Sequence, residues 1–222
     1  MSINIAIDGP AGAGKSTIAK RVAGKLGYIY IDTGAMYRAM GLYFSRKGIA
    51  PENEAAIRKQ VKEADISIVY QEGAQQVLLN GENVTAYLRT EEAGNMASAT
   101  SGYPCVREKL VELQRKLAAA ENVVMDGRDI GTVVLPQADV KIFLTASAEV
   151  RAQRRYAELI SKGETVTLDK VLADMRQRDK QDSTRAIAPL RCAEDAVRLD
   201  TSEMSLDEAE AAILKIVRGK LG

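Results

Sequence analysis

Gly9-Pro10-Ala11-Gly12-Ala13-Gly14-Lys15-Ser16 decides the fold, because it matches the phosphate-binding pattern GxxxxGK[ST] at every specified position. The segment follows the apolar run Ile3 to Ile7 and opens a helical pattern, Ser16 to Leu26. In this strand–loop–helix context the glycines allow backbone N–H groups and the helix N-terminus to surround a phosphate. Lys15 is expected to reach the β- and γ-phosphates of a nucleoside triphosphate, and Ser16 to ligate Mg²⁺. The residues expected to line this donor site are Gly9, Pro10, Ala11, Gly12, Ala13, Gly14, Lys15, Ser16 and Thr17.

Composition narrows the class of protein. The chain has 222 residues, of which 46% are hydrophobic, which suffices for one α/β core with insertions. A net charge of +1 provides no long-range field for nucleic acid or an anionic membrane, so neither is expected as a partner. The chain has no histidine, which excludes imidazole catalysis. Cys105 and Cys192 form no CxxC pair, and no apolar run approaches the ~20 residues of a membrane span, so we expect a cytoplasmic protein.

Apolar runs alternate with helical patterns, as a parallel α/β sheet requires. Four of the predicted strands end in an aspartate, and the carboxyl edge of such a sheet is where ligands bind. These aspartates are Asp8, Asp32, Asp126 and Asp200. The predicted strands are 3–8, 28–32, 122–126, 140–144 and 196–200, and the predicted helices are 16–26, 104–120, 148–161, 168–185 and 205–221.

One stretch interrupts this alternation. Ile66 to Tyr70 and Val77 to Leu79 have short β character, with a turn expected over residues 71–74 and a second turn signal at Asn80-Gly81. They predict a small antiparallel hairpin or three-stranded sheet inserted into the α/β frame. The pattern leaves a structural decoration and a functional insert equally open.

Two further segments carry charged residues next to predicted strands. In Asp126-Gly127-Arg128-Asp129-Ile130-Gly131-Thr132, Asp126 is placed to hold hydrated Mg²⁺ or to face an acceptor, and Arg128 to clamp a phosphate. In Asp32-Thr33-Gly34-Ala35-Met36-Tyr37-Arg38, a capping residue precedes an arginine by about one helical turn. An ordinary strand–helix connection with a solvated arginine explains this second segment equally well.

Two arginine groups have helical spacing. Arg151, Arg154 and Arg155 share one helical face, and so do Arg178, Asp182 and Arg185. Solvated helical faces often have such spacing, but the guanidinium fork suits phosphate, so we favour phosphate binding for both groups.

Nearly the whole chain resembles the bacterial cytidylate kinases, a family of nucleoside monophosphate kinases. The resemblance covers the segment 8–17, Asp32 to Arg38, the β insert, the helix opening at Tyr103-Pro104, Asp126 to Thr132, and Thr184 to Leu190. It implies a P-loop kinase fold in the α/β class, with a five-stranded parallel sheet flanked by helices, a β insert and a mobile helical lid. It also implies one unit with a core at 1–37, 95–147 and 164–222, a monophosphate-binding region at 38–94 and a lid at 148–163.

The resemblance also implies residue roles. Ser98, Arg107 and Asp129 would recognise cytosine, whereas Arg38 and Arg128 would bind the acceptor phosphate. Arg178, Asp182 and Arg185 would bind the sugar and phosphates, and Thr33 keeps a hydroxyl where many relatives have serine. Arg151 and Arg155 would reach across the donor, with Arg154 less involved. The substrate-binding set is therefore Thr33, Arg38, Ser98, Arg107, Asp126, Arg128, Asp129, Arg178, Asp182 and Arg185, and the charge-stabilising set is Lys15, Arg128, Arg151, Arg155 and Arg185.

The implied activity is the ATP-dependent, Mg²⁺-assisted conversion of CMP to CDP, with dCMP as a second acceptor, by a monomer. A P-loop kinase for UMP, AMP or shikimate is the nearest alternative. A GTPase switch is disfavoured because the chain has no NKxD guanine-reading motif.

Overall fold

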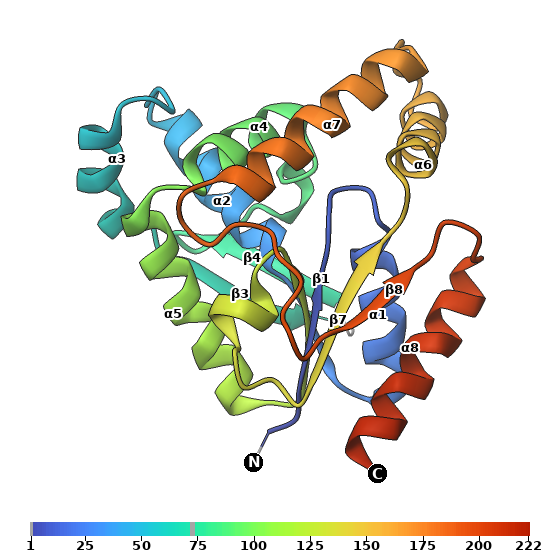
Figure 1. The fold of residues 1–222 in the computed structure, drawn as a ribbon. Helices are drawn as coiled ribbons and strands as arrows, with labels where there is room; N and C mark the ends of the chain where they lie inside the picture. Colours follow the sequence, from blue (N-terminus) through green and yellow to red (C-terminus); the bar gives the residue numbers. More distant parts are fainter. Residues whose placement is uncertain (1, 72–73) are drawn as a thin grey trace. The chain divides into compact units, whose positions relative to one another are not determined.

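The computed structural model describes residues 2–71 and 74–222 (Figure 1). The chain folds into two compact units, and its expected behaviour as one P-loop kinase unit stays a prediction. The first comprises the residues up to Tyr30 and from Glu121 onward, and the second comprises Ile31–Ala120. The predicted division into core, monophosphate-binding region and lid concerns ligand binding and stays a prediction.

A five-stranded sheet with the order β2-β6-β1-β7-β8 is the frame of the fold. Its strands are β1 (Asn4–Asp8), β2 (Ile29–Asp32), β6 (Val123–Gly127), β7 (Val140–Thr145) and β8 (Val197–Asp200). Strand β1 is central and pairs in parallel with β6 and β7. The register sets Asp8 beside Gly127 on one side and Phe143 on the other. The carboxyl ends of these strands therefore meet at one edge, as predicted.

Two helices of the first unit share a core with this sheet. They are α1 (Lys15–Leu26) and α8 (Leu206–Leu221). Ile5, Ile142 and Leu144 from the strands pack with Ile18 and Ile213 from the helices in one fully buried cluster. The N-terminus of α8 has a capping box, in which Ser205 and Glu208 satisfy each other's backbone N–H groups.

Helices α6 (Ala148–Ser161) and α7 (Leu168–Thr184) lie side by side in the first unit (Figure 1). A small cluster joins them, with Ala152 and Leu159 from α6 and Val171 and Met175 from α7. The predicted lid at 148–163 consists almost entirely of α6. Its side chains are therefore positioned by the packing of α6 on α7.

The second unit is built from helices and a small antiparallel sheet. The helices are α2 (Thr33–Arg46), α3 (Glu54–Gln60), η1 (Val61–Glu63), η2 (Thr85–Tyr87), α4 (Glu91–Thr100) and α5 (Pro104–Ala120). The sheet has the order β3-β4-β5, with β3 (Ile66–Gln71), β4 (Ala74–Leu79) and β5 (Glu82–Asn83). This confirms the inserted antiparallel sheet. Of the turn predicted at 71–74, Glu72 and Gly73 lie outside the described residues.

The predicted strands and helices of the α/β frame are confirmed to within about two residues, the usual scatter of such boundaries. Helices α5 and α6 begin and end as predicted. Helices α3 and α4 were not predicted, and of α2 only its start, with the capping residue Asp32, was. The Asp126-to-Thr132 segment leads into a short π-helical turn, η3 (Ile130–Val134), which also had no counterpart in the sequence pattern. Among residues 2–71 and 74–222, no helix has both the length and the apolar composition needed to cross a bilayer.

Close packing of α2 on α4 depends on a glycine. A Cβ added to Gly41 would lie 2.9 Å from the backbone nitrogen of Ala97 and 3.2 Å from the carbonyl oxygen of Ala93. The two helix backbones can approach this closely only because position 41 has no side chain. These helices carry Arg38 and Ser98, so the same contact fixes two predicted acceptor-site residues.

We expect Gly41→Ala to lower the free energy of unfolding by about 1–3 kcal/mol, because α2 and α4 must separate to admit the methyl group. Gly94→Ala on α4 is the matched control, since a Cβ at Gly94 would meet nothing within 4 Å among the described residues. That change should raise stability by about 0.5–1 kcal/mol through backbone entropy. Urea denaturation of both variants measures the difference, and equal effects would contradict this account of the packing.

Candidate active site

The phosphate loop runs directly against the neighbouring strand β7. Gly9 has a φ of +151°, and a Cβ at this position would lie 1.9 Å from the carbonyl oxygen of Leu144. No side chain can occupy such a position, so glycine is required for the loop to leave β1 at this point. The close approach fixes where the loop begins.

The loop ends at the N-terminus of α1. Gly14, in the left-handed conformation with a φ of 84°, precedes the helix, and its carbonyl oxygen accepts the N–H of Ile18 at 3.1 Å. Gly14 has no side chain that could cap the first turn of α1. In the described residues of that turn there is also no acidic side chain to occupy the N–H groups. The first N–H groups of α1 and the positive end of its dipole are therefore directed at the loop, which suits an anion.

The side chain of Lys15, the first residue of α1, folds back onto the phosphate loop that precedes it. Its Nζ donates to the carbonyl oxygen of Pro10 at 2.7 Å, and the residue is only 5% exposed. Burial, and then the nearby charge of Arg128, lower the pKa of Lys15 to about 7, although Asp126, Asp8 and Asp182 oppose this shift. The surroundings therefore disfavour the charged amine overall. A polyphosphate beside Lys15 would supply the missing negative charge.

Ser16 and Asp126 bring two oxygen atoms together at the carboxyl edge of the sheet. The Ser16 hydroxyl donates to Asp126 Oδ2 at 3.0 Å, and the Tyr30 hydroxyl donates to Asp126 Oδ1 at 2.8 Å. A hydroxyl and a carboxylate are the hard oxygen ligands that Mg²⁺ prefers, and Mg²⁺ usually takes its other ligands from water and phosphate. This pair of side chains therefore fits the predicted magnesium site.

Asp8 fixes the turn that follows β6. Its two carboxylate oxygens accept the N–H groups of Ile130 at 2.8 Å and Gly131 at 2.7 Å. Burial raises the pKa of Asp8 to about 6, although both hydrogen bonds oppose that shift. The bidentate contact holds the start of η3, and it thereby holds Arg128 and Asp129 immediately before it.

The charged residues around this turn are paired. Arg128 Nε donates to Asp182 Oδ2 at 2.9 Å, and Arg185 Nη2 donates to Asp129 Oδ1 at 3.3 Å. Arg185 also donates through Nε to the carbonyl oxygen of Ala188 at 2.5 Å, which folds the segment after α7 back on itself. Arg178 lies half-buried on α7. The structure thus brings together Arg128, Asp182, Asp129 and Arg185.

The three arginines of α6 lie in different surroundings. Arg151 is 4% exposed, and its Nη1 donates to the phosphate-loop carbonyl of Ala11 at 2.9 Å. Arg154 Nη2 donates to the carbonyl oxygen of Thr201 at 2.7 Å. Arg155 pairs with Glu158 at 2.9 Å, and its side chain is 41% exposed. Arg151 and Arg155 are therefore not equivalent.

In the second unit, Asp32 connects the β insert to α2. Asp32 Oδ1 caps α2 by accepting the N–H of Ala35 at 2.8 Å, and Oδ2 accepts from Arg38 Nη2 at 3.3 Å. Gln75 on β4 accepts the backbone N–H of Asp32 through its Oε1 at 2.8 Å. Arg38 Nε is buried and has no hydrogen-bond partner among the described residues. Such a guanidinium has donor capacity left for an anion.

The other predicted residues of the second unit come from three helices. Arg107 on α5 is 5% exposed, lies 5.8 Å from the centre of the Tyr37 ring, and donates to the carbonyl oxygen of Ser101 at 3.4 Å. Thr33 is buried at the start of α2, and Ser98 is half-buried on α4. Arg107 is a buried cation next to an aromatic ring, an arrangement that suits recognition of a polar, planar group.

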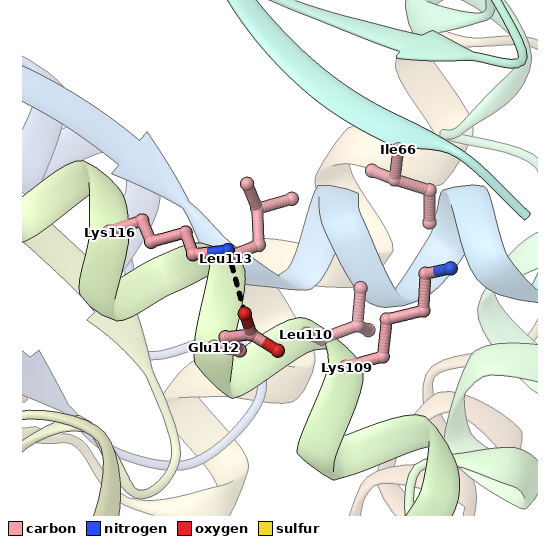
Figure 2. A pocket seen from close by; sticks show the side chains of 6 residues that line it. All are labelled: Ile66, Lys109, Leu110, Glu112, Leu113 and Lys116. Carbon is pink, nitrogen blue, oxygen red and sulfur yellow. Dashed lines mark ion pairs between the residues drawn. The ribbon is translucent and has the colours of Figure 1, made fainter. Parts of the chain in front are cut away.

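Two features of the molecule are not part of the candidate active site. Asp200 ends β8 as predicted, but its carboxylate accepts from the N–H and the hydroxyl of Ser202 in an exposed turn. A cavity of about 180 Å³ in the second unit lies between Ile66 and α5, where Lys109, Leu110, Glu112, Leu113 and Lys116 line it (Figure 2). No predicted site residue lines this cavity.

Sequence reasoning missed four contacts of this site. They are the bond of Asp8 to the turn after β6, the bond of Tyr30 to Asp126, the bond of Gln75 to Asp32, and the pairing of Arg151 with Asp179. The only signal available was the place of Asp8 at a strand end. Each of the other three partners is separated from its residue by at least 28 positions, so the pairing depends on the tertiary structure.

Comparisons with known proteins bear on the identity of the chain. The family model described as cytidylate kinase matches residues 5–219. A cytidylate kinase of Carboxydothermus hydrogenoformans is 49% identical over 218 residues, which covers 98% of each chain. A cytidylate kinase of Caldicellulosiruptor bescii is 50% identical over 214 residues, covering 96% of this chain and 95% of that protein.

Solved structures support the fold alone. An uncharacterized protein of Eubacterium ventriosum has a TM-score of 0.53 at 16% identity, with 99% of both chains covered. A shikimate kinase of Bacteroides thetaiotaomicron has a TM-score of 0.50 at 14% identity, with 97% of this chain and 98% of that chain covered. The P-loop kinase fold predicted from the sequence is confirmed. The family model and the full-length relatives confirm the resemblance as well, and this chain belongs to the cytidylate kinase family.

Proposed function

We propose that the chain transfers the γ-phosphoryl group of ATP to CMP, giving ADP and CDP, and that dCMP is a second acceptor. Family membership over nearly the full chain supports the kinase activity. The observation that carries the assignment is the buried Lys15 inside a complete phosphate loop, beside the oxygen pair of Ser16 and Asp126. The remaining roles below rest on this arrangement.

The donor polyphosphate would lie on the N–H groups of the phosphate loop and on α1. Lys15 would exchange its bond to Pro10 for phosphate oxygens, which would restore a normal environment for its charge. Ser16 and Asp126 would hold Mg²⁺, which when bound neutralises charge on the donor phosphates. Arg128, Arg155 and Arg185 would supply the rest of the charge stabilisation, whereas Arg151, to which the resemblance assigns the same role, contacts the phosphate loop itself.

The acceptor would be bound through its phosphate and its base. Arg38 and Arg128 would take the phosphate, Arg178, Asp182 and Arg185 the sugar and phosphates, and Thr33 and Ser98 would add polar contacts. Cytosine offers an N4 donor beside the N3 and O2 acceptors, whereas uracil offers an O4 acceptor and an N3 donor. Asp129 would accept from N4 and Arg107 would donate to N3 or O2. Uracil would leave these buried groups unpaired, at about 1–3 kcal/mol each.

This chemistry requires no basic imidazole. An acceptor phosphate oxygen is already nucleophilic near neutral pH, so transfer depends on alignment and on charge stabilisation. The chain supplies cations and a rigid loop for these two tasks, which explains how a kinase can function without histidine. A monomeric state and a cytoplasmic location stay predictions from the sequence.

A coupled assay of ADP formation tests the proposal. With ATP and Mg²⁺, we expect CMP and dCMP to be phosphorylated with a kcat/KM at least about tenfold higher than that for UMP or AMP, because each mismatched buried group costs a factor of this size. Shikimate should give no turnover. Preference for UMP, AMP or shikimate would assign the chain to another acceptor, and preference for GTP without an acceptor would favour the GTPase alternative.

Asp129→Asn tests the assignment of the base. We expect kcat/KM for CMP to fall by about tenfold or more, since an amide lacks the charge of a carboxylate as an acceptor for N4. The dissociation constant for ATP should change by less than about twofold, because the donor site lies on the phosphate loop. Asp139→Asn is the matched control, because Asp139 is an exposed carboxylate that accepts the backbone N–H of Asn4 at 2.7 Å. An equal loss of ATP affinity and CMP turnover in Asp129→Asn would place Asp129 in the donor site.

A further inference from the structure

Arg151 is held by four hydrogen bonds from three parts of the first unit. Its Nε donates to Ala146 at 2.9 Å and its Nη1 to Ala11 at 2.9 Å, both to carbonyl oxygens. Asp179 on α7 accepts from Nη1 at 3.1 Å and from Nη2 at 2.6 Å in a bidentate pair. A guanidinium has five N–H groups, so these bonds use four of them.

The next residue of the phosphate loop, Gly12, also packs closely against Arg151. Gly12, in the left-handed conformation at φ +74°, lies so close to α6 and α7 that an added Cβ would be 2.7 Å from Met175 Cε and 3.4 Å from Arg151 Cβ. Ala11 and Gly12 are therefore shaped by side chains of α6 and α7. A change in the position of Arg151 would change the shape of the donor loop.

Asp179 supplies the charge that makes this arrangement possible. The Arg151 side chain is 5% exposed, whereas that of Asp179 is 27% exposed. Carbonyl oxygens satisfy the N–H groups but do not neutralise the buried cation, so removal of the Asp179 charge would leave a buried cation without its carboxylate, which is costly. Among the described residues, Asp179 is the carboxylate that pairs directly with Arg151.

Arg155 differs from Arg151 in its partner and in its exposure to solvent. It pairs with Glu158 on its own helix, and both side chains are more than 40% exposed. An exposed pair at this spacing is worth less than about 1 kcal/mol, so Arg155 can exchange Glu158 for a phosphate at little cost. Arg151 would have to give up four hydrogen bonds to do the same.

We infer that Arg151 works in place, as a clamp that holds the phosphate loop to α7, and that Asp179 is the positioning residue that keeps it there. The inference rests on the proposed function only in that ATP occupies the phosphate loop. It assigns Arg151 and Asp179 to donor affinity, and it leaves Arg155 as the α6 arginine free to move toward the transferred phosphoryl group. Loss of the clamp should raise the KM for ATP while kcat changes little, because the loop binds ATP in both the ground state and the transition state.

A double-mutant cycle tests the clamp. The variants are Asp179→Asn, Arg151→Ala and the double variant, and the readouts are the ATP dissociation constant by calorimetry without CMP, and kcat and KM for each substrate. We expect Asp179→Asn to raise the ATP dissociation constant by about tenfold, with kcat and the KM for CMP within about twofold. In the Arg151→Ala background, Asp179→Asn should add no further change, because it acts through Arg151. Asp174→Asn, an exposed aspartate on the same helix, should match the wild type.

Two results would overturn the inference. One is an unchanged ATP dissociation constant in Asp179→Asn, and the other is an equal further loss in the Arg151→Ala background. If Asp179→Asn does not fold, Arg151→Lys replaces it, because lysine keeps the charge but cannot reach Ala146, Ala11 and Asp179 together. A rise of about fivefold in its ATP dissociation constant supports the clamp, and no rise overturns it. Failure of the wild type to bind ATP or phosphorylate CMP would instead reject the proposed function.

Discussion

The compensation of buried positive charge around the phosphate loop is the constraint on which the first unit depends. Arg128 pairs with Asp182, Arg151 with Asp179, and Arg185 with Asp129. Lys15 instead donates to the carbonyl oxygen of Pro10, which does not neutralise its charge. Each cation belongs to a different element or loop, so the compensating bonds also tie these elements to one another. A protein without need of phosphate would gain stability from apolar residues at such positions. The concentration of cations is therefore explained by the charge of the substrates.

The fold and the chemistry share the same contacts. The approach of Gly9 to Leu144 fixes the start of the loop, and Asp8 fixes the turn that carries Arg128 and Asp129. Helix α7 places two carboxylates one turn apart, so that one serves the donor loop and the other serves Arg128. In the proposed function, the phosphate groups of the substrates would replace partners such as Pro10 or Asp182, because the cations are already in position. In the second unit, Asp32 combines the capping of α2 with the orientation of Arg38.

Secondary-structure elements with a local sequence motif or a clear periodicity could be predicted from the sequence. Elements and site contacts that depend on residues far apart in the chain could not. The phosphate loop, the five strands and the helices after residue 100 have strong periodicity or a specific motif, and the structure confirms them. Helix α2 has a buried apolar stripe at helical spacing, Met36, Ala39, Met40, Tyr43 and Phe44, but only the capping residue at its start was recognised. Helix α4 consists largely of small or polar residues, so it lacks such a stripe and was not predicted. The turn η3 is stabilised by Asp8, which is more than 120 positions away. The roles of the site residues came from the resemblance to a family, whereas the pairing of Arg151 with Asp179 required the structure.

The most direct test of this account is the stability of Lys15→Met in the absence of nucleotide. Burial holds the pKa of Lys15 at about 7 in the folded protein, well below its ordinary value of 10.5, so the charged amine destabilises the fold at pH 6. Between these two pKa values the unfolded chain binds more protons than the folded one, so the stability of the wild type rises with pH through this group. The account predicts that Lys15→Met abolishes phosphoryl transfer but raises the midpoint of thermal unfolding at pH 6 by about 2–8 °C, with a smaller gain at pH 9. A variant less stable than the wild type at pH 6 would contradict the claim that the cations are present for phosphate rather than for the fold.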